Sequence, residues 1–295
     1  MKLVAVICVR MSSNRLSGKP LCVYDEHSHK TNLECIIDRV STSRHKPQVI
    51  VATSKSESDD PILALCSKKD WTWYRGDLQN VVSRFDGAIQ AHAKEASRVW
   101  RVMTDNPLID IGLVDHRIDV LERYKADLVV PILPEPTYAA QSNIWSRDAW
   151  GYCVKMSSGS LLEHPGEYLY ENAGQFKTVY DPGPETVYYQ PIRTELDTPE
   201  DLEFFKKVWV EYDRDIENPR RLLYTEKVIN WLYPRPDIVS INAHIQIKTS
   251  TTYAHGHPRA RNWICKECGH IIASKVNDGL AINCQKCGTE RRFYP

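Results

Sequence analysis

Apolar and polar positions follow two alternating periods along the first 130 residues. Continuous apolar and β-branched runs predict buried strands at residues 3–9, 47–53, 71–74, 99–103 and 128–132. Between these runs, apolar residues recur every three or four positions and predict helices near residues 33–40, 60–69, 81–93 and 114–124. Regular alternation of this kind predicts a three-layer α/β domain with a largely parallel sheet. Such domains bind ligands at the carboxyl ends of their strands.

The pattern weakens in the middle of the chain and changes again near its end. Residues 134–190 are rich in aromatic residues, Pro, Gly and Ser, which predicts irregular insertions or an oligomer contact such as a homodimer surface. A threonine cap at Thr198, Pro199 and the acids after it predict a helix to about residue 212. Beyond residue 247 the chain becomes polar and basic. We therefore predict two domains, residues 1–247 and residues 248–295.

Composition narrows the classes of protein and ligand. Lys plus Arg and Asp plus Glu number 38 each, so no overall field favours nucleic acid or an acidic membrane. The apolar stretch of residues 2–9 stops at Arg10, too early for a signal peptide or a membrane span, and predicts a cytoplasmic protein with no membrane association. Five of the nine cysteines are scattered and four form two close pairs, which argues against a disulfide scaffold.

A basic loop follows the first predicted strand. It combines three cations with hydroxyl groups and one glycine, and its loop amides can also point at an anion. Cations four to five residues apart can contact several phosphate groups and offset their mutual repulsion. A solvated basic loop is the alternative interpretation. The residues predicted to bind a triphosphate are Arg10, Ser12, Ser13, Arg15 and Lys19.

Two aspartates are candidate ligands for magnesium. Asp105 follows the fourth predicted strand, and Pro107 keeps the preceding residue away from helical conformation at the edge of the sheet. Asp197 precedes the helix that starts near Thr198, where its alternative role is helix capping. Two carboxylates from distant segments can share one metal ion, although sequence alone does not bring them together.

Several of these segments resemble the cytidylyltransferase family. Residues 10–19 are similar to its R-x-x-S-x-R-L-P-G-K loop, particularly in the spore-coat polysaccharide type related to CMP-sialate and CMP-ketodeoxyoctulosonate synthetases. Three further motifs occur in the family's order, and residues 225–242 resemble the end of the family's domain. These motifs begin at Arg75-Gly76-Asp77, at Thr104-Asp105-Asn106-Pro107 and at Leu196-Asp197-Thr198-Pro199.

The resemblance implies a Rossmann-like nucleotide-diphospho-sugar transferase domain of the GT-A-like type. It implies that Arg15 and Lys19 neutralise the reacting and leaving phosphates, that Asp105 and Asp197 bind magnesium, and that Arg75 contacts the nucleotide or the acceptor. Two residues depart from the family pattern. Ser17 replaces the loop proline, which removes a constraint on φ. Thr104 replaces the glycine before the aspartate, at a point where the family's glycine allows close approach to the backbone.

The function implied is transfer of CMP from CTP to an acidic sugar or a small phosphorylated acceptor, with release of pyrophosphate. No residue selects the acceptor; Tyr188, Tyr189 and Arg193 are candidate contacts, with core packing the alternative for the tyrosines. A competing hypothesis is a catalytically degenerate nucleotide-binding protein that recruits nucleic acid or a protein partner. A transferase that uses another nucleotide is a third, because a phosphate loop does not select the base.

The C-terminal cysteines have the spacing of a structural zinc site. The pattern Cys265-x2-Cys268-x15-Cys284-x2-Cys287 is typical of a four-cysteine zinc ribbon, and a glycine follows each pair. Redox chemistry is the alternative, which two similar pairs disfavour. A closed zinc site stabilises a small fold and does not catalyse. The basic residues of this tail, with Trp263 and Phe293, permit contact with nucleic acid without establishing it.

Overall fold

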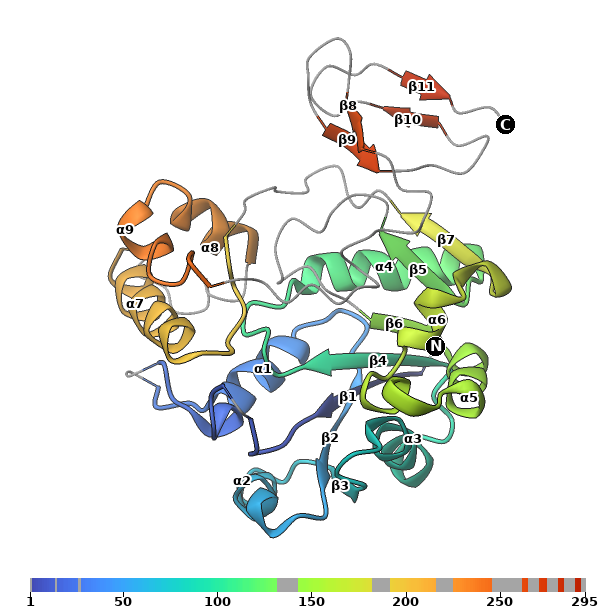
Figure 1. Ribbon diagram of the computed structural model, residues 1–295, viewed down its shortest axis with the longest axis horizontal. Coiled ribbons are helices and arrows are strands. Elements are labelled where there is room, and N and C mark those ends of the chain that lie inside the picture. The colour runs from blue at the N-terminus through green and yellow to red at the C-terminus, as the bar shows by residue number, and fades with distance from the viewer. Residues whose placement is uncertain are drawn as a thin grey trace.

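The structure is a computed structural model that describes residues 2–13, 15–25, 28–131, 143–181, 192–215 and 225–245, together with four short strands between residues 262 and 292. One seven-stranded sheet forms its centre, in the order β3-β2-β1-β4-β6-β5-β7 (Figure 1). The strands are β1 (Leu3–Cys8), β2 (Gln48–Ser54), β3 (Trp73–Gly76), β4 (Arg98–Met103), β5 (Leu128–Pro131), β6 (Asn143–Ser146) and β7 (Thr178–Asp181).

Strand β1 lies between β2 and β4, and all three are parallel. After β1 the chain adds β2 and β3 on one side of β1, and it then crosses over to add β4 on the other side. The carboxyl ends of β1 and β4 therefore border a topological switch point. Open α/β sheets bind ligands in the crevice at such a point. The phosphate loop predicted after β1 and the aspartate predicted after β4 are therefore brought to the same edge of the sheet.

The predicted strands are confirmed, with one shift. The third strand begins at Trp73, two residues later than predicted, because the amide of Trp71 donates a hydrogen bond to Cys66 O and closes helix α2 (Asp60–Lys68). The sheet is also mixed, because β6 pairs antiparallel with both β4 and β5.

The prediction of irregular structure after residue 134 was wrong for residues 143–181. This segment holds strands β6 and β7 and helices α5 (Arg147–Met156) and α6 (Glu167–Glu171). Strand β6 is only four residues long and fully buried, and α5 begins where Ser146 Oγ accepts a hydrogen bond from the amide of Ala149. Short elements of this kind give too few periods to be recognised by pattern alone.

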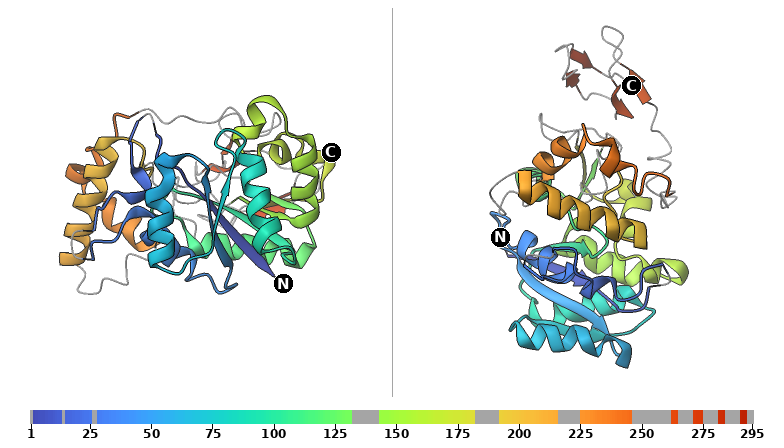
Figure 2. Two further views of the ribbon diagram at one scale, coloured as in Figure 1. Left: turned by 90° about the horizontal axis from the view of Figure 1, so that it is seen from below. Right: turned by 90° about the vertical axis from the view of Figure 1, so that its left-hand side faces the viewer.

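Helices cover both faces of the sheet (Figure 2). The alternate side chains of β1 divide between the two cores, with Ala5 and Ile7 on one face and Val4 and Val6 on the other. The first core contains side chains of α1 (Asn32–Val40), α2 and α4 (Ile111–Tyr124). The second contains side chains of α3 (Val81–His92), α5 and α6. This arrangement confirms the predicted three-layer α/β architecture.

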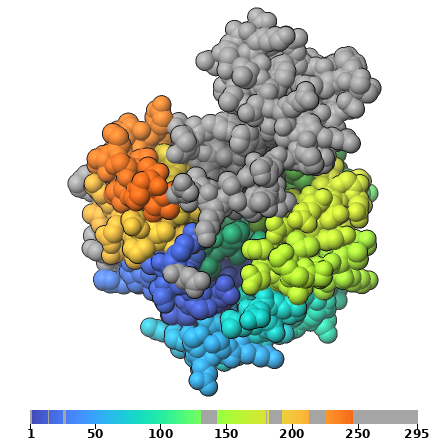
Figure 3. All heavy atoms as spheres, viewed as in Figure 1, coloured from blue at the N-terminus to red at the C-terminus, as the bar shows by residue number. Residues whose placement is uncertain are grey.

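A third apolar cluster joins the C-terminal helices to the sheet. Helices α7 (Pro199–Asp215), α8 (Thr225–Leu232) and α9 (Pro236–Val239) pack with Tyr24 and Leu108, which follow β1 and β4 in the chain. Figure 3 shows these helices, in yellow and orange, as a lobe beside the N-terminal segments in blue. The predicted threonine cap of α7 is confirmed, because Thr198 Oγ1 accepts a hydrogen bond from the amide of Asp201 at 3.3 Å.

The remaining elements are short. The 3-10 helices are η1 (Lys19–Leu21), η2 (Glu57–Asp59), η4 (Gly159–Glu163) and η5 (Ala173–Gln175). Near the C-terminus, β8 (Asn262–Ile264) pairs antiparallel with β9 (Ile271–Ser274), and β10 (Ala281–Asn283) pairs antiparallel with β11 (Glu290–Arg292). Among the helices within the described ranges, none has the length and apolar character needed to cross a membrane.

Candidate active site

The basic loop leaves β1 and turns back at Gly18. The amide of Gly18 donates a hydrogen bond to Met11 O at 3.1 Å, and Gly18 has a φ of 72°, in the left-handed region that favours glycine. Arg10 and Ser12 are exposed, while Ser13 is half-buried and its Oγ accepts a hydrogen bond from the amide of Leu16. The loop thus presents polar groups at the carboxyl end of the central strand.

Two loop cations contact Asp197, which is far away in the sequence. Lys19 Nζ lies 2.6 Å from Asp197 Oδ1, and Arg15 forms an ion pair with Asp197 Oδ2. Asp197 is 4% exposed, whereas the Arg15 side chain is 39% exposed and that of Lys19 is 13% exposed. The structure therefore brings together three of the residues predicted for the site, from opposite ends of the domain.

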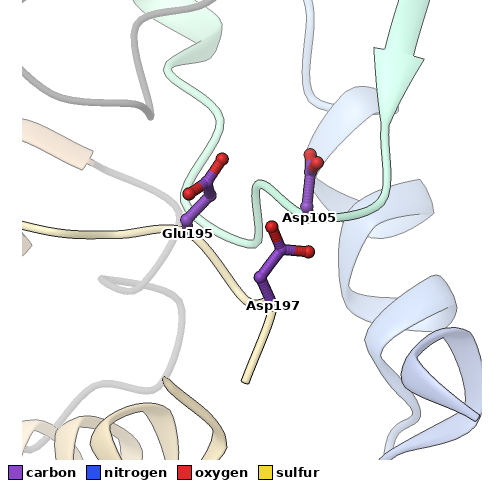
Figure 4. A group of neighbouring side chains, drawn as sticks. All are labelled: Asp105, Glu195 and Asp197. Carbon is purple, nitrogen blue, oxygen red and sulfur yellow. The ribbon is translucent and has the colours of Figure 1, made fainter. Parts of the chain in front are cut away.

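Asp105 lies in the turn after β4, next to the segment that carries Asp197. The amide of Leu196 donates a hydrogen bond to Asp105 O at 2.8 Å, which ties the two segments together. Carboxylate oxygens of Asp105, Glu195 and Asp197 lie within 4.8 Å of one another. Figure 4 shows the three carboxylates around a common space, with Glu195 and Asp197 on the segment before α7.

This cluster fits a hard divalent cation. Carboxylate oxygens are the protein ligands that Mg²⁺ prefers, and three of them from two segments leave coordination positions for water and phosphate oxygens. Asp197 is paired with the loop cations, whereas Asp105 and Glu195 have no ion pair to them among the contacts within the described ranges. The donor set and its partial burial suit a magnesium ion.

Glu195 was not predicted from the sequence. It lies two residues before Asp197, and in an extended segment residues i and i+2 point to the same side. This i, i+2 spacing is the sequence signal for Glu195, and the helix start after Asp197 obscures it because acids are common before a helix. The structure shows that Asp197 is not the cap of α7, because its carboxylate faces Arg15 and Lys19 while Thr198 caps the helix.

Burial and mutual repulsion change the protonation of the acids. Burial raises the pKa of Asp105, an effect that Lys19 opposes and Asp197 reinforces. Burial, with the nearby charges of Asp105 and Asp197, raises the pKa of Glu195 to about 7. Crowded carboxylates with raised pKa values are typical of functional sites.

A network of hydrogen bonds and ion pairs, centred on Arg193, Asp201 and Asn242, holds the acidic segment behind the carboxylate cluster. The Arg193 guanidinium donates to both carboxylate oxygens of Asp201 at 2.8 Å, and its third nitrogen lies 2.7 Å from Glu195 Oε2. Asp201 Oδ2 also accepts hydrogen bonds from the amides of Asp197 and Thr198. Arg193, predicted as a candidate acceptor contact, is 4% exposed and belongs to this network.

Asn242 joins the network to the C-terminal helices. Its Nδ2 donates to Asp201 Oδ1 at 2.9 Å and to Arg193 O at 3.2 Å. Both carboxylate oxygens of the fully buried Asp201 are therefore saturated by donors, which lowers its pKa despite the opposing effect of burial.

Arg75 has partners within its own part of the domain. Its guanidinium donates to Ser54 O at 2.9 Å and to Ser56 O at 2.8 Å, and it pairs with Asp60 Oδ1 at 3.0 Å. The contact with nucleotide or acceptor predicted for Arg75 stays a prediction. Thr104, the departure from the family's glycine, uses its carbonyl oxygen to accept a hydrogen bond from Asn32 Nδ2 at 2.7 Å.

Several predicted residues lie outside the described ranges. They are Tyr188, Tyr189, Cys265, Cys268, Cys284 and Cys287.

The sequence matches known proteins over most of its length. A family described as Cytidylyltransferase matches residues 4–257, which extends past the predicted domain boundary at residue 247. The spore coat polysaccharide biosynthesis protein SpsF of Bacillus subtilis is 26% identical over 222 residues, covering 69% of this chain and 85% of that protein.

Solved structures show the same fold. A cytidylyltransferase from Leptospira borgpetersenii serovar Hardjo-bovis has a TM-score of 0.68 and 20% identity, and the match covers 84% of this chain and all of that one. A CMP:2-keto-3-deoxy-manno-octonic acid synthetase, complexed with CTP, has a TM-score of 0.52 and 17% identity, covering 72% of this chain and all of that one.

Proposed function

Because this chain belongs to the cytidylyltransferase family, we propose that it transfers CMP from CTP to an acidic sugar or a small phosphorylated acceptor. The observation that carries the proposal is the meeting of Arg15 and Lys19 with Asp105, Glu195 and Asp197 at the carboxyl ends of β1 and β4. Cations for a triphosphate and oxygen ligands for a metal are the two requirements of nucleotidyl transfer.

The reaction forms one bond and breaks one. An acceptor oxygen attacks the α-phosphorus of CTP, the bond from that phosphorus to the bridging oxygen breaks, and pyrophosphate leaves in line while the acceptor loses its proton. Such a transition state carries spread negative charge and little covalent chemistry for the protein. Catalysis therefore depends on positioning and on neutralisation of charge.

In this proposal the loop residues bind the triphosphate, and Lys19 and Arg15 neutralise charge on the leaving pyrophosphate. Asp105 and Asp197 hold magnesium, with Glu195 as the third carboxylate beside it. The metal supplies Lewis acidity at the reacting phosphate. Arg193 and Asp201 keep Glu195 and Asp197 oriented without contacting the reactants. The choice of cytosine and of the acceptor class rests on family membership and on the relatives' names.

Two measurements test the proposal. Thermal stabilisation by each nucleoside triphosphate with magnesium reports the preferred base without knowledge of the acceptor, and CTP should stabilise most. Pyrophosphate release from CTP, magnesium and a panel of acidic sugars and phosphorylated acceptors then identifies the acceptor. If no nucleotide stabilises the protein and no acceptor yields pyrophosphate, the proposal is wrong.

We propose that residues 248–295 form a separate domain in which Cys265, Cys268, Cys284 and Cys287 bind one structural zinc ion. The two antiparallel hairpins support this proposal, because each cysteine pair starts directly after the first strand of a hairpin, β8 or β10. Four thiolates from two such connections suit tetrahedral zinc. Mass spectrometry of the native protein should find one zinc per chain, and Cys265→Ser should reduce it. Native protein without zinc, whose four thiols all react freely, would contradict the site.

A further inference from the structure

Asp59, at the end of η2, holds a buried negative charge that the proposed chemistry does not use. Its carboxylate is fully buried. Oδ2 accepts hydrogen bonds from Ser54 N at 3.1 Å, Ser54 Oγ at 2.5 Å and Thr53 Oγ1 at 3.1 Å. Oδ1 accepts one from Met11 N at 2.7 Å. A buried carboxylate costs several kcal/mol unless donors replace its water, and here hydrogen bonds supply all the compensation that the structure describes.

The fourth donor joins Asp59 to the phosphate loop. Met11 is the base of that loop, because its amide donates to Asp59 while its carbonyl oxygen accepts the hydrogen bond from Gly18 N. The peptide groups on both sides of Met11 are thereby fixed, one to Asp59 at the end of η2 and one to Gly18 at the far end of the loop. Arg10 precedes this base, Arg15 lies within the loop, and Lys19 follows it directly.

We propose that Asp59 is a positioning residue for triphosphate binding. By fixing the base of the loop, it sets the direction in which Arg10, Arg15 and Lys19 leave the sheet. This role rests on the proposed function, since the ligand of the loop is taken to be the triphosphate of CTP. Asp59 acts through Met11 and does not touch the nucleotide.

Electrostatics and positioning predict opposite signs for the same substitution. Replacing Asp59 with asparagine removes a negative charge close to an anion site, and Coulomb's law alone would then strengthen triphosphate binding. The asparagine amide cannot accept all the hydrogen bonds from Thr53, Ser54 and Met11, so the base of the loop loses part of its support. A weakened affinity can therefore come only from lost positioning.

The test compares Asp59→Asn with Asp115→Asn. Asp115 is also buried and accepts hydrogen bonds from Ser43 Oγ at 2.5 Å and Arg44 N at 3.2 Å, far along the chain from the loop. Both variants should lower the melting temperature. By calorimetry with CTP and magnesium on folded protein, Asp59→Asn should bind about tenfold more weakly than wild type, and Asp115→Asn should bind as wild type does.

Gly18→Ala provides a second variant if Asp59→Asn does not fold. A Cβ at Gly18 would meet Met11 Cε at 3.8 Å, which is an ordinary contact. The substitution therefore strains only the left-handed φ of residue 18, whose amide bonds the carbonyl oxygen of Met11. It should weaken CTP binding in the same way. Unchanged or tighter CTP binding in either folded variant overturns the role of Asp59 and leaves the proposed function standing. Absence of CTP binding by wild-type protein overturns both.

Discussion

The acidic segment of residues 193–201 and the basic loop of residues 10–19 carry opposite charges, and the fold holds them by different means. The acidic segment is held behind the site by Arg193, Asp201 and Asn242, whose hydrogen bonds leave the carboxylates of Asp197 and Glu195 facing outward. The orientation of the carboxylates is therefore set by contacts with the buried Arg193 and Asp201.

Among the described residues, polar contacts join the basic loop to distant segments at Met11 and at Asp197, and Leu16 packs against the third apolar cluster. Asp59 and Gly18 fix Met11, but Arg15 and Lys19 reach across to Asp197 and gain their main charged partner there. Cations paired with a carboxylate can move to a phosphate group when one binds nearby. The network behind the acids, in contrast, cannot rearrange without losing buried hydrogen bonds. The comparison indicates a site with a fixed acidic half and an adjustable basic half.

The largest effect is expected at Asp105, whose backbone is tied to the acidic segment through Leu196. Asp105→Asn removes a proposed magnesium ligand, and kcat/KM for pyrophosphate release should fall by at least about a hundredfold, the scale on which one electrostatic group acts in a preorganised site. Asp110→Asn is the control in the same loop, because Asp110 caps α4 by accepting from Leu113 N at 3.0 Å. Full activity of Asp105→Asn alongside that control would remove Asp105 from the chemistry.

The second largest effect is expected on the free energy of unfolding, when the network behind the acids is broken. Asp201→Asn takes from the buried Arg193 the carboxylate that accepts two of its hydrogen bonds, and the free energy of unfolding measured in urea should fall by about 3 kcal/mol. Glu203→Gln is the control, since Glu203 forms an exposed pair with Lys206 on the same helix and should change stability by less than about 0.5 kcal/mol. Equal effects for the two variants would mean that the acidic half is not over-determined.

The sequence predicted the basic half better than the acidic half. Arg10, Arg15 and Lys19 follow a buried strand directly, so a local pattern reveals them, and the family motifs locate Asp105 and Asp197. The network behind the acids could not be predicted, because it depends on tertiary contacts. Asn242 and Asp201 are 41 residues apart, and neither has a local signal for their contact. Asp59 was missed for the same reason, since its donor Met11 lies 48 residues earlier.

A pH dependence should expose the repulsion among the three carboxylates. Burial together with Asp105 and Asp197 raises the pKa of Glu195 to about 7, so the folded state binds this proton more tightly than the unfolded state. The stabilisation is complete below the unfolded pKa near 4.5 and is lost as the pH rises through 7. In the presence of chelator, unfolding free energies at pH 5 and pH 8 should differ by on the order of 2 kcal/mol more in wild type than in Glu195→Gln. Identical pH profiles would place Glu195 outside the crowded cluster.

The smallest effect tests the adjustable half most directly. Both oxygens of Asp197 carry a loop cation, so free CTP must compete with Asp197 for Lys19 and Arg15 and also approach three carboxylates. Asp197→Asn removes one negative charge and releases both cations, and metal-free CTP should bind about tenfold more tightly. The same variant should lose turnover with magnesium, because a proposed metal ligand is gone.

Lys19→Met separates this explanation from a general change in charge. It should weaken CTP binding both with and without magnesium, because a cation is lost whether or not Asp197 is neutralised. Binding and turnover therefore change in opposite directions for Asp197→Asn and in the same direction for Lys19→Met. If Asp197→Asn binds metal-free CTP no better than wild type, the ion pairs do not restrain the loop cations. The position of the basic loop would then depend on its base at Met11 and not on its ion pairs with Asp197.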